Sequence, residues 1–92
     1  MANVLIISSN DDVAVALSDL PKGVALSTAE GALGISTQEM IPFGHKVAIR
    51  PVERDEPVIK YGASIGVATE SIAPGEHVHT HNLQSVRGAS AS

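Results

Sequence analysis

Histidine is the residue type in this sequence that most strongly suggests chemistry. Three of the four histidines fall in one short stretch, Glu76-His77-Val78-His79-Thr80-His81-Asn82. If this stretch forms a strand, alternate side chains share a face, so His77, His79 and His81 project together at spacings of about 6.5–7 Å. Imidazoles at positions i and i+2 can bind one divalent ion such as zinc, iron(II), manganese or nickel. His77 and His79 are therefore candidate metal ligands.

The same pattern is also compatible with a histidine-rich edge strand that is simply solvated, because H-x-H pairs recur in proteins that bind no metal. Two imidazoles are fewer than the three or four protein ligands that a closed site needs. Further ligands would have to come from His45, from a carboxylate or from another chain. The spacing does not indicate which metal would bind.

A second set of candidates lies beside two turns. Pro42 and Gly44 predict a bend that holds His45 and Lys46 at one end of the following strand. A histidine with a pKa near neutrality can move protons, and a lysine beside it can hold a substrate carboxylate. Lys60 precedes another turn and is a candidate for contact with an anion. The alternative interpretation is a turn histidine with two solvated lysines.

Short β-strands must position these side chains. Apolar or alternating segments between Gly- and Pro-containing turns predict strands over residues 4–7, 13–17, 24–27, 46–50, 57–61, 64–69 and 77–81, with a hairpin or loop over 29–38. No window of helical length has a 3.6-residue apolar period. We therefore expect one small all-β domain, a barrel or clip, with its core over about residues 3–84 and a flexible tail over 85–92.

An internal repeat supports this expectation. Segments that start at Val15, Val47 and Val67 each contain a Val-Ala strand, an apolar residue five positions after the valine, and then a turn. The copies are unevenly spaced, which indicates one strand–turn unit reused within a single domain rather than a solenoid. Chance similarity among short β-rich segments is the alternative.

Composition argues against several classes of function. The net charge is −4, and the aromatic residues are one Phe and one Tyr, so neither a basic nucleic-acid footprint nor a base-stacking surface is expected. The apolar run at residues 4–7 is too short for a signal peptide or membrane span and is expected to be a buried first strand. With no cysteine, the chain has no disulfide or thiolate site. We expect a cytoplasmic protein that binds neither nucleic acid nor membrane.

Three motifs occur in a specific order: PFGHK at residues 42–46, PVIKYG at 57–62 and GEHVHTHN at 75–82. Together they resemble the SAF domain of the altronate and galactarate dehydratases, and the similarity extends over roughly residues 10–84. The resemblance implies a small β-clip fold with many short strands. It also implies dehydration of a hydroxylated sugar acid such as altronate to a 2-keto-3-deoxy acid, with a divalent metal, Fe²⁺ or Mn²⁺.

The resemblance also implies partners and roles for residues. In many members this domain precedes a much larger one, so a chain of this kind implies a larger dehydratase-type subunit that completes the site, a small hydroxy-acid substrate, and an assembled enzyme that can be a homo-oligomer. Motif position assigns His77 and His79 to the metal and His45 and Lys46 to catalysis. Lys60, His81 and Asn82 are assigned to substrate binding.

Two other functions stay open. The small subunit of sulfolactate sulfo-lyase, which eliminates sulfite, is similar, and the same fold can serve as a non-catalytic acid- or metal-binding module. The turn over residues 53–56 lacks the glycine usual in this family, and Asp55 can take its place. Exposed apolar surface is expected wherever a partner docks.

Overall fold

The structure, a computed structural model, describes residues 2–85, and within that range it contains strands and turns but no helix. The all-β class is therefore confirmed. No segment of this range is a helix long and apolar enough to cross a bilayer. The strands are β1 (Val4–Leu5), β2 (Val13–Ala16), β3 (Ala25–Thr28), β4 (Gly31–Ser36), β5 (Lys46–Ala48), β6 (Pro57–Lys60), β7 (Ala63–Ala68), β8 (His77–Val78) and β9 (Leu83–Ser85).

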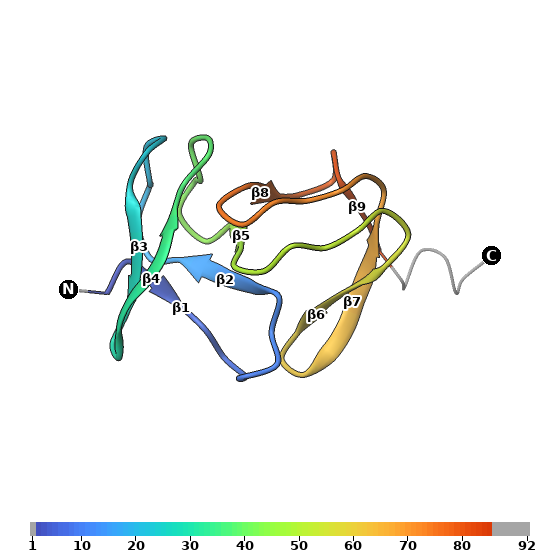
Figure 1. The fold of residues 1–92 in the computed structure, drawn as a ribbon, viewed down its shortest axis with the longest axis horizontal. Coiled ribbons are helices and arrows are strands. Elements are labelled where there is room, and N and C mark those ends of the chain that lie inside the picture. The colour runs from blue at the N-terminus through green and yellow to red at the C-terminus, as the bar shows by residue number, and fades with distance from the viewer. Residues whose placement is uncertain (1, 86–92) are drawn as a thin grey trace.

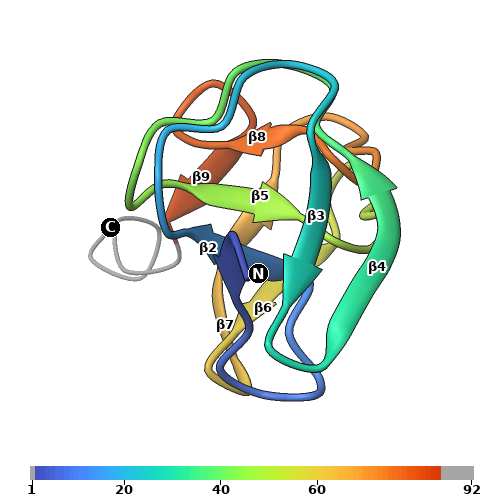
Figure 2. The ribbon, with the colours of Figure 1, turned by 90° about the vertical axis from the view of Figure 1, so that its left-hand side faces the viewer.

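Three antiparallel sheets lie side by side along the longest axis of the molecule (Figure 1). The central sheet has the strand order β1-β2-β5-β8. The β3–β4 hairpin lies on one side of it, and the sheet β6-β7-β9 lies on the other. Figure 2 looks onto the β3–β4 hairpin, with the central strands behind it. The central sheet is thus the element on which both outer sheets depend.

Side chains that alternate along the central strands contribute to two separate hydrophobic cores. Ala14 and Val47 pack with Leu26 on the side of the β3–β4 hairpin, whereas Val13 and Ala48 pack in the core on the opposite side. Because consecutive strand residues face opposite sides, neighbours in β5 enter different halves of the domain. His45 lies on the face of Val47, and Lys46 lies on the face of Ala48.

Four turns of one design connect the strands. Each begins with a buried apolar residue and reaches a residue with positive φ three positions later. They are Leu20–Gly23, Ile41–Gly44, Val52–Asp55 and Ile72–Gly75. The first two are joined by a β-bridge between Leu20 and Ile41, and the last two by a bridge between Val52 and Ile72.

Reciprocal backbone hydrogen bonds complete each pair of turns. The N–H of Gly23 donates to Thr37 O and that of Gly44 donates to Ala16 O, both at 2.9 Å. In the second pair the N–H of Asp55 donates to Ala68 O at 2.8 Å, and the N–H of Gly75 donates to Ala48 O at 2.7 Å. The predicted repeat is therefore a real structural unit with a fourth copy. The sequence hides that copy because Ser36-Thr37 stands where the others have Val-Ala.

Several predicted boundaries are wrong. The run at residues 4–7 pairs only at Val4 and Leu5, and Leu5 and Ile7 are 47% and 50% exposed, so it is not a buried strand. The last histidine strand ends at Val78, because residues 79–82 form a turn. The pattern does not predict β9. The hairpin expected within residues 29–38 is present as β4 paired with β3.

Asp55 and the end of the chain also differ in how they compare with the sequence-based expectations. Asp55 adopts a φ of 72°, so it takes the place that glycine has in the other three turns. Ser85, the first residue of the expected tail, ends β9. Residues 86–92 of that tail lie outside the described residues.

The turn design predicts unequal effects for two glycine substitutions. Gly44 and Gly75 both have positive φ, but a Cβ at Gly44 meets nothing within 4 Å, whereas one at Gly75 collides with the carbonyl oxygen of Ser36. Gly44→Ala should lower the free energy of unfolding by about 1 kcal/mol, the cost of left-handed backbone. Gly75→Ala should cost at least twice as much in urea unfolding. Equal losses would contradict the proposed collision.

Candidate functional site

The four histidines meet at one edge of the central sheet. His45 directly precedes β5, His77 lies in β8, and His79 and His81 lie in the turn after β8. The ring centroids of His45 and His79 are 4.8 Å apart, and those of His45 and His77 are 5.0 Å apart. The ring of His77 is 5.3 Å from that of His79 and 5.6 Å from that of His81. We call these four side chains the imidazole cluster.

Strand pairing explains how residues far apart in sequence reach the imidazole cluster. β5 pairs with β8 so that Val47 lies opposite His77, and His45 shares the face of Val47 because it is two residues earlier. Nδ1 of His45 is 2.9 Å from Nε2 of His77, a hydrogen bond in which one ring donates and the other accepts. The backbone of His45 is fixed as well, since its N–H donates to Pro42 O at 3.0 Å.

His79 reaches the cluster by a route that alternation along a strand does not describe. β8 ends at Val78, and the N–H of Asn82 donates to His79 O at 3.0 Å to close a turn. The rings of His77 and His79 are therefore closer together than the roughly 6.5–7 Å between alternate residues of a strand. The three-histidine strand expected from the sequence is wrong, although the histidines do come together.

Glu39 is a neighbour of the cluster that the sequence analysis misses. Its Oε2 accepts the backbone N–H of His77 at 3.2 Å, across a separation of 38 residues. Glu39 belongs to none of the three motifs, and only the fold brings it to the histidines. The hydroxyl of Thr80 also lies 3.3 Å from Nδ1 of His79.

Partial burial lowers the pKa of His77 from its ordinary value, and the neighbouring rings of His45 and His79 lower it further. The charge of Glu39 raises the pKa of His77 but does not reverse the shift, to which His81 also contributes in the lowering direction. His77 is therefore neutral near pH 7. A neutral imidazole is the form that accepts a proton or binds a metal.

The imidazole cluster has donors of a type that suits a metal, but their arrangement does not form a complete metal site. Neutral imidazole nitrogen is a ligand for iron(II), zinc and similar ions. Within residues 2–85, however, no group of three or more His, Cys, Asp or Glu side chains is arranged so that it could hold a metal ion. His77 and His79 thus fit a metal by type but do not make a closed site by themselves.

Lys46 and Lys60 form a separate charged group. Alternation along β5 places Lys46 on the opposite face of the sheet from His45, although the two are adjacent in sequence. Burial lowers the pKa of Lys46, the charge of Lys60 lowers it further, and Tyr61 opposes the shift. Nζ of Lys60 lies 4.5 Å from the centroid of the Tyr61 ring. The fold thus associates Lys46 with Lys60 rather than with the imidazoles.

Two aspartates that the sequence analysis does not select hold the turn beside Lys60. Asp11 is 1% exposed, and its carboxylate accepts the N–H of Gly62 at 3.0 Å and that of Ser8 at 3.1 Å. Oδ2 of Asp12 accepts the N–H of Ile59 at 3.0 Å. Burial raises the pKa of Asp11, but backbone hydrogen bonds, led by that from Gly62, outweigh it and hold the pKa below its ordinary value.

Asn82 and His81 differ in how they could meet a substrate. His81 is exposed at the surface of the turn. Asn82 is 1% exposed, and both polar atoms of its amide are engaged: Oδ1 accepts the N–H of His79 at 2.9 Å, and Nδ2 donates to His77 O at 2.8 Å. The amide of Asn82 therefore lies beneath the turn rather than on the surface of the site.

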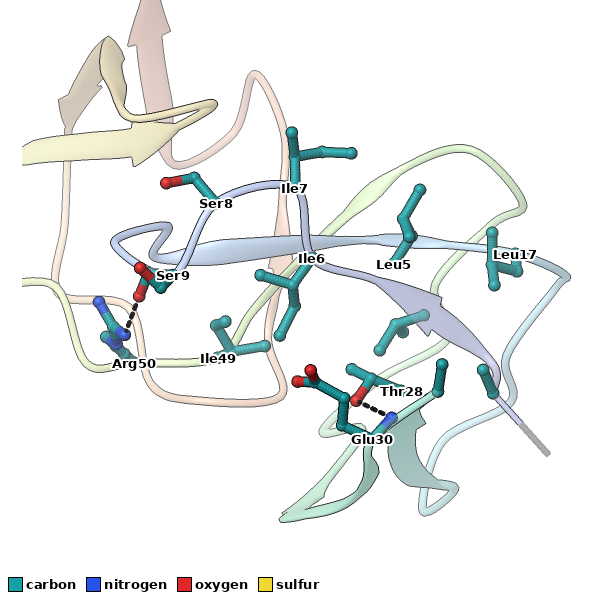
Figure 3. A pocket seen from close by; sticks show the side chains of 13 residues that line it. Leu5, Ile6, Ile7, Ser8, Ser9, Leu17, Thr28, Glu30, Ile49 and Arg50 are labelled. Atoms are coloured by element: carbon teal, nitrogen blue, oxygen red, sulfur yellow. Dashed lines mark hydrogen bonds between the residues drawn. The ribbon is translucent and has the colours of Figure 1, made fainter.

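An apolar groove of 680 Å³ runs along β1, and no predicted site residue lines it. Figure 3 shows Leu5, Ile6 and Ile7 on one wall, with Ile49 and Arg50 on another segment. Nη2 of Arg50 donates to Ser9 O at 2.7 Å. Exposed apolar surface also occurs beside the cluster at Phe43, which is 66% exposed. The groove is thus a surface of the kind expected where a partner docks.

Comparison with known proteins agrees with these motifs. The family model described as the altronate/galactarate dehydratase SAF domain matches residues 2–86. The chain belongs to this family. The match spans all four turns and both strands that carry the imidazole cluster, so the SAF domain is the unit that positions these side chains.

Curated relatives of this SAF domain are lyases by name. It is 34% identical to an altronate dehydratase of Bacillus subtilis over 91% of this chain and 16% of that protein. It is 40% identical to an altronate dehydratase of Escherichia coli over 80% of this chain and 14% of that protein. It is 49% identical to the alpha subunit of (2R)-sulfolactate sulfo-lyase of Chromohalobacter salexigens over 60% of this chain and 58% of that subunit. The chain thus spans a small part of the dehydratases.

The low pKa of His77 predicts a pH-dependent stability. In the window between the folded pKa and the unfolded value of about 6.5, the unfolded state binds more protons. The free energy of unfolding should therefore fall as the pH decreases through this window and be fully present above it. Urea unfolding between about pH 5 and about pH 8 should show a smaller fall for His77→Gln than for the unchanged protein or the surface variant Lys22→Gln. A difference between His77→Gln and the unchanged protein that is constant with pH would contradict the assignment.

Proposed function

We propose that this SAF domain is the small part of a lyase that removes water from a hydroxylated sugar acid, such as altronate, to give a 2-keto-3-deoxy acid. A larger dehydratase-type chain completes the active site. The observation that carries the proposal is the imidazole cluster, four rings gathered at a sheet edge of a domain whose family is that of altronate and galactarate dehydratases.

The elimination needs two kinds of help from the protein. The proton on the carbon next to the carboxylate must be removed, and the departing hydroxyl must be protonated or otherwise stabilised. His45 is the residue we assign to proton transfer, because the hydrogen bond to His77 fixes its ring. His81, exposed beside His77, is suited to contact with substrate hydroxyl groups.

Lys46 and Lys60 are assigned to the substrate carboxylate. Burial lowers the pKa of Lys46, and the positive charge of Lys60 lowers it further. An anion between or beside the two lysines would relieve their repulsion. Asp11 and Asp12 support this group from below by holding the β6–β7 turn. Lys46 is thus assigned to substrate binding rather than to a direct part in proton transfer.

A divalent metal, Fe²⁺ or Mn²⁺, is part of the proposal for the assembled enzyme. His77 and His79 would hold it together with ligands from the larger chain. When bound, such an ion supplies Lewis acidity toward the carboxylate or hydroxyl of the acid.

The need for a larger chain is supported by where the cluster lies and by how much of its relatives the domain covers. The imidazoles are at an edge of a small sheet, with an exposed Phe43 on the neighbouring turn. The altronate dehydratases have most of their length outside the matched segment. We further propose that the assembled enzyme is cytoplasmic, that it can be a homo-oligomer, and that neither nucleic acid nor membrane is among its partners.

A second candidate function is elimination of sulfite from sulfolactate. It is favoured by the 49% identity to the sulfo-lyase alpha subunit, which exceeds the identity to either altronate dehydratase. The two eliminations need the same proton removal and differ in the leaving group. A non-catalytic module that binds acids or metals is the third alternative.

Purification of the tagged chain from its native cells, with any co-purifying chain identified by mass, separates these functions. The complex is then supplied with altronate, galactarate or sulfolactate, and 2-keto acid and sulfite are measured. We expect a large dehydratase-type chain and keto acid from a sugar acid without sulfite. Sulfite release would favour the second function. A domain that is stable alone, has no large partner and binds acids or metals without turnover would refute the lyase.

Replacement of His79 tests the role of the imidazole cluster in the assembled enzyme. We expect His79→Ala to reduce kcat by about 100-fold or more, because loss of a metal ligand or proton-transfer partner typically has this effect. Lys22→Ala, a change at an exposed residue outside the cluster, is the control and should retain activity. Unchanged turnover by His79→Ala would remove His79 from the site.

Replacement of Lys60 tests recognition of the carboxylate. Lys60→Gln should raise KM by about 10-fold or more and change kcat less, since a lost hydrogen bond to a charged group is worth roughly 1.5–3 kcal/mol. Lys22→Gln removes the same charge elsewhere on the surface and serves as the matched control. If both variants raise KM equally, the effect is one of net charge and not of a local contact.

A further inference from the structure

We infer that Asn82 is a positioning residue, whose side-chain amide folds the segment after β8 into the turn that brings His79 against His45. The geometric part of this inference is independent of the reaction. Its consequence for catalysis rests on the proposed function.

The position of His79 requires a cause, because no strand pairing places it. β8 ends at Val78, yet the ring of His79 stacks on His45 with centroids 4.8 Å apart and an interplanar angle of 13°. His77 is held differently, by the pairing of β8 with β5. Only the turn over residues 79–82 can set the direction of His79.

The amide of Asn82 bonds both ends of the segment that must bend. Oδ1 accepts the N–H of His79 at 2.9 Å, while Nδ2 donates to the carbonyl oxygen of His77 at 2.8 Å. The orientation of the amide is fixed by chemistry, because an N–H can meet only the oxygen and a carbonyl only the nitrogen. One planar amide thus connects His77, in β8, to His79, the first residue after β8.

The backbone of Asn82 anchors this arrangement to the rest of the domain. Its N–H donates to His79 O at 3.0 Å, and its carbonyl accepts the N–H of Thr69 at 3.0 Å, just beyond the end of β7. Asn82 is 1% exposed, and within the described part of the chain no buried side-chain nitrogen or oxygen lacks a hydrogen-bond partner. Both polar atoms of the amide are therefore engaged inside the protein, which separates Asn82 from the residues that would contact substrate.

Few other side chains can replace this amide. Aspartate keeps an acceptor for His79 but has no donor for the carbonyl of His77, and it places a carboxylate oxygen against that carbonyl. Alanine leaves both backbone groups without their partner in a buried place. We call the two side-chain hydrogen bonds of Asn82 the clamp. Asn82→Asp removes the bond to His77, and Asn82→Ala removes both bonds.

The chain offers a matched control in Thr37. Thr37 is buried, and its hydroxyl accepts the N–H of Val24 at 2.9 Å and donates to Pro21 O at 2.6 Å. It thus clamps a different turn with the same number of side-chain hydrogen bonds. Thr37→Val should destabilise the domain without altering the imidazole cluster.

The test is proton NMR of the isolated chain, in which contacts between imidazole rings are read as nuclear Overhauser effects. In Asn82→Asp and Asn82→Ala we expect the effect between His45 and His79 to be lost and that between His45 and His77 to remain. Thr37→Val should retain both. The inference is overturned if the variants of Asn82 keep the contact between His45 and His79, or if Thr37→Val loses it to the same extent.

Hydrogen exchange of the unchanged protein decides the question if neither variant of Asn82 folds. The backbone amide of His79 and the side-chain amide of Asn82 should exchange with solvent at least 10-fold more slowly than the backbone amide of Thr80 in the same turn. Exchange of both at the rate of Thr80 would mean that the clamp is not formed, and the inference would be wrong.

In the assembled enzyme, Asn82→Asp should lower kcat by roughly 10–100-fold with little change in KM, as residues that orient a ligand do. Thr37→Val should leave both constants near their original values. If the unchanged enzyme has no lyase activity, the proposed function fails, while the ring contacts still decide the role of Asn82. If activity is present and Asn82→Asp retains full kcat, the catalytic consequence is overturned.

Discussion

Reciprocal hydrogen bonding between paired turns is the constraint on which the rest of this domain depends. The chain has no disulfide, and its described part has no helix, so the backbone bonds of these turns and the two hydrophobic cores hold three small sheets together. The turn before His45 belongs to one pair and the turn before His77 to the other. Ala48 links them, because it bonds Gly75 and Glu76 while its strand β5 begins beside His45. The meeting of the two imidazoles is thus a consequence of how the turn pairs are joined.

The central sheet separates the side chains of the candidate site into two groups. His45 and His77 share the face of Val47, toward the β3–β4 hairpin, and Lys46 shares the opposite face with Ala48, toward β6–β7. Each group is supported by buried polar side chains, Asn82 beneath the histidines and Asp11 beside the lysine turn. These buried side chains can hold the two groups in place because their own polar atoms have hydrogen-bond partners inside the domain.

The sequence predicts local features well and contacts between distant segments poorly. Glycine and proline mark the turns, and short apolar segments mark most strands, because these signals act within a few residues. Glu39 could not be selected, since only the loop before β5 brings it to His77. The motif assigns Asn82 to the substrate, but its side chain is buried, which the motif does not encode. The association of Lys46 with Lys60 likewise depends on which face of β5 Lys46 occupies.

The short β1 strand has a practical consequence for handling the domain alone. It is the terminal strand of the central sheet, and exposed Leu5 and Ile7 lie beside it along the apolar groove. Exposed apolar surface of this kind is a place where protein chains associate. At high concentration, the purified single chain should therefore associate with itself through this apolar surface. Self-association through the groove would then limit the concentration at which the single chain stays monomeric.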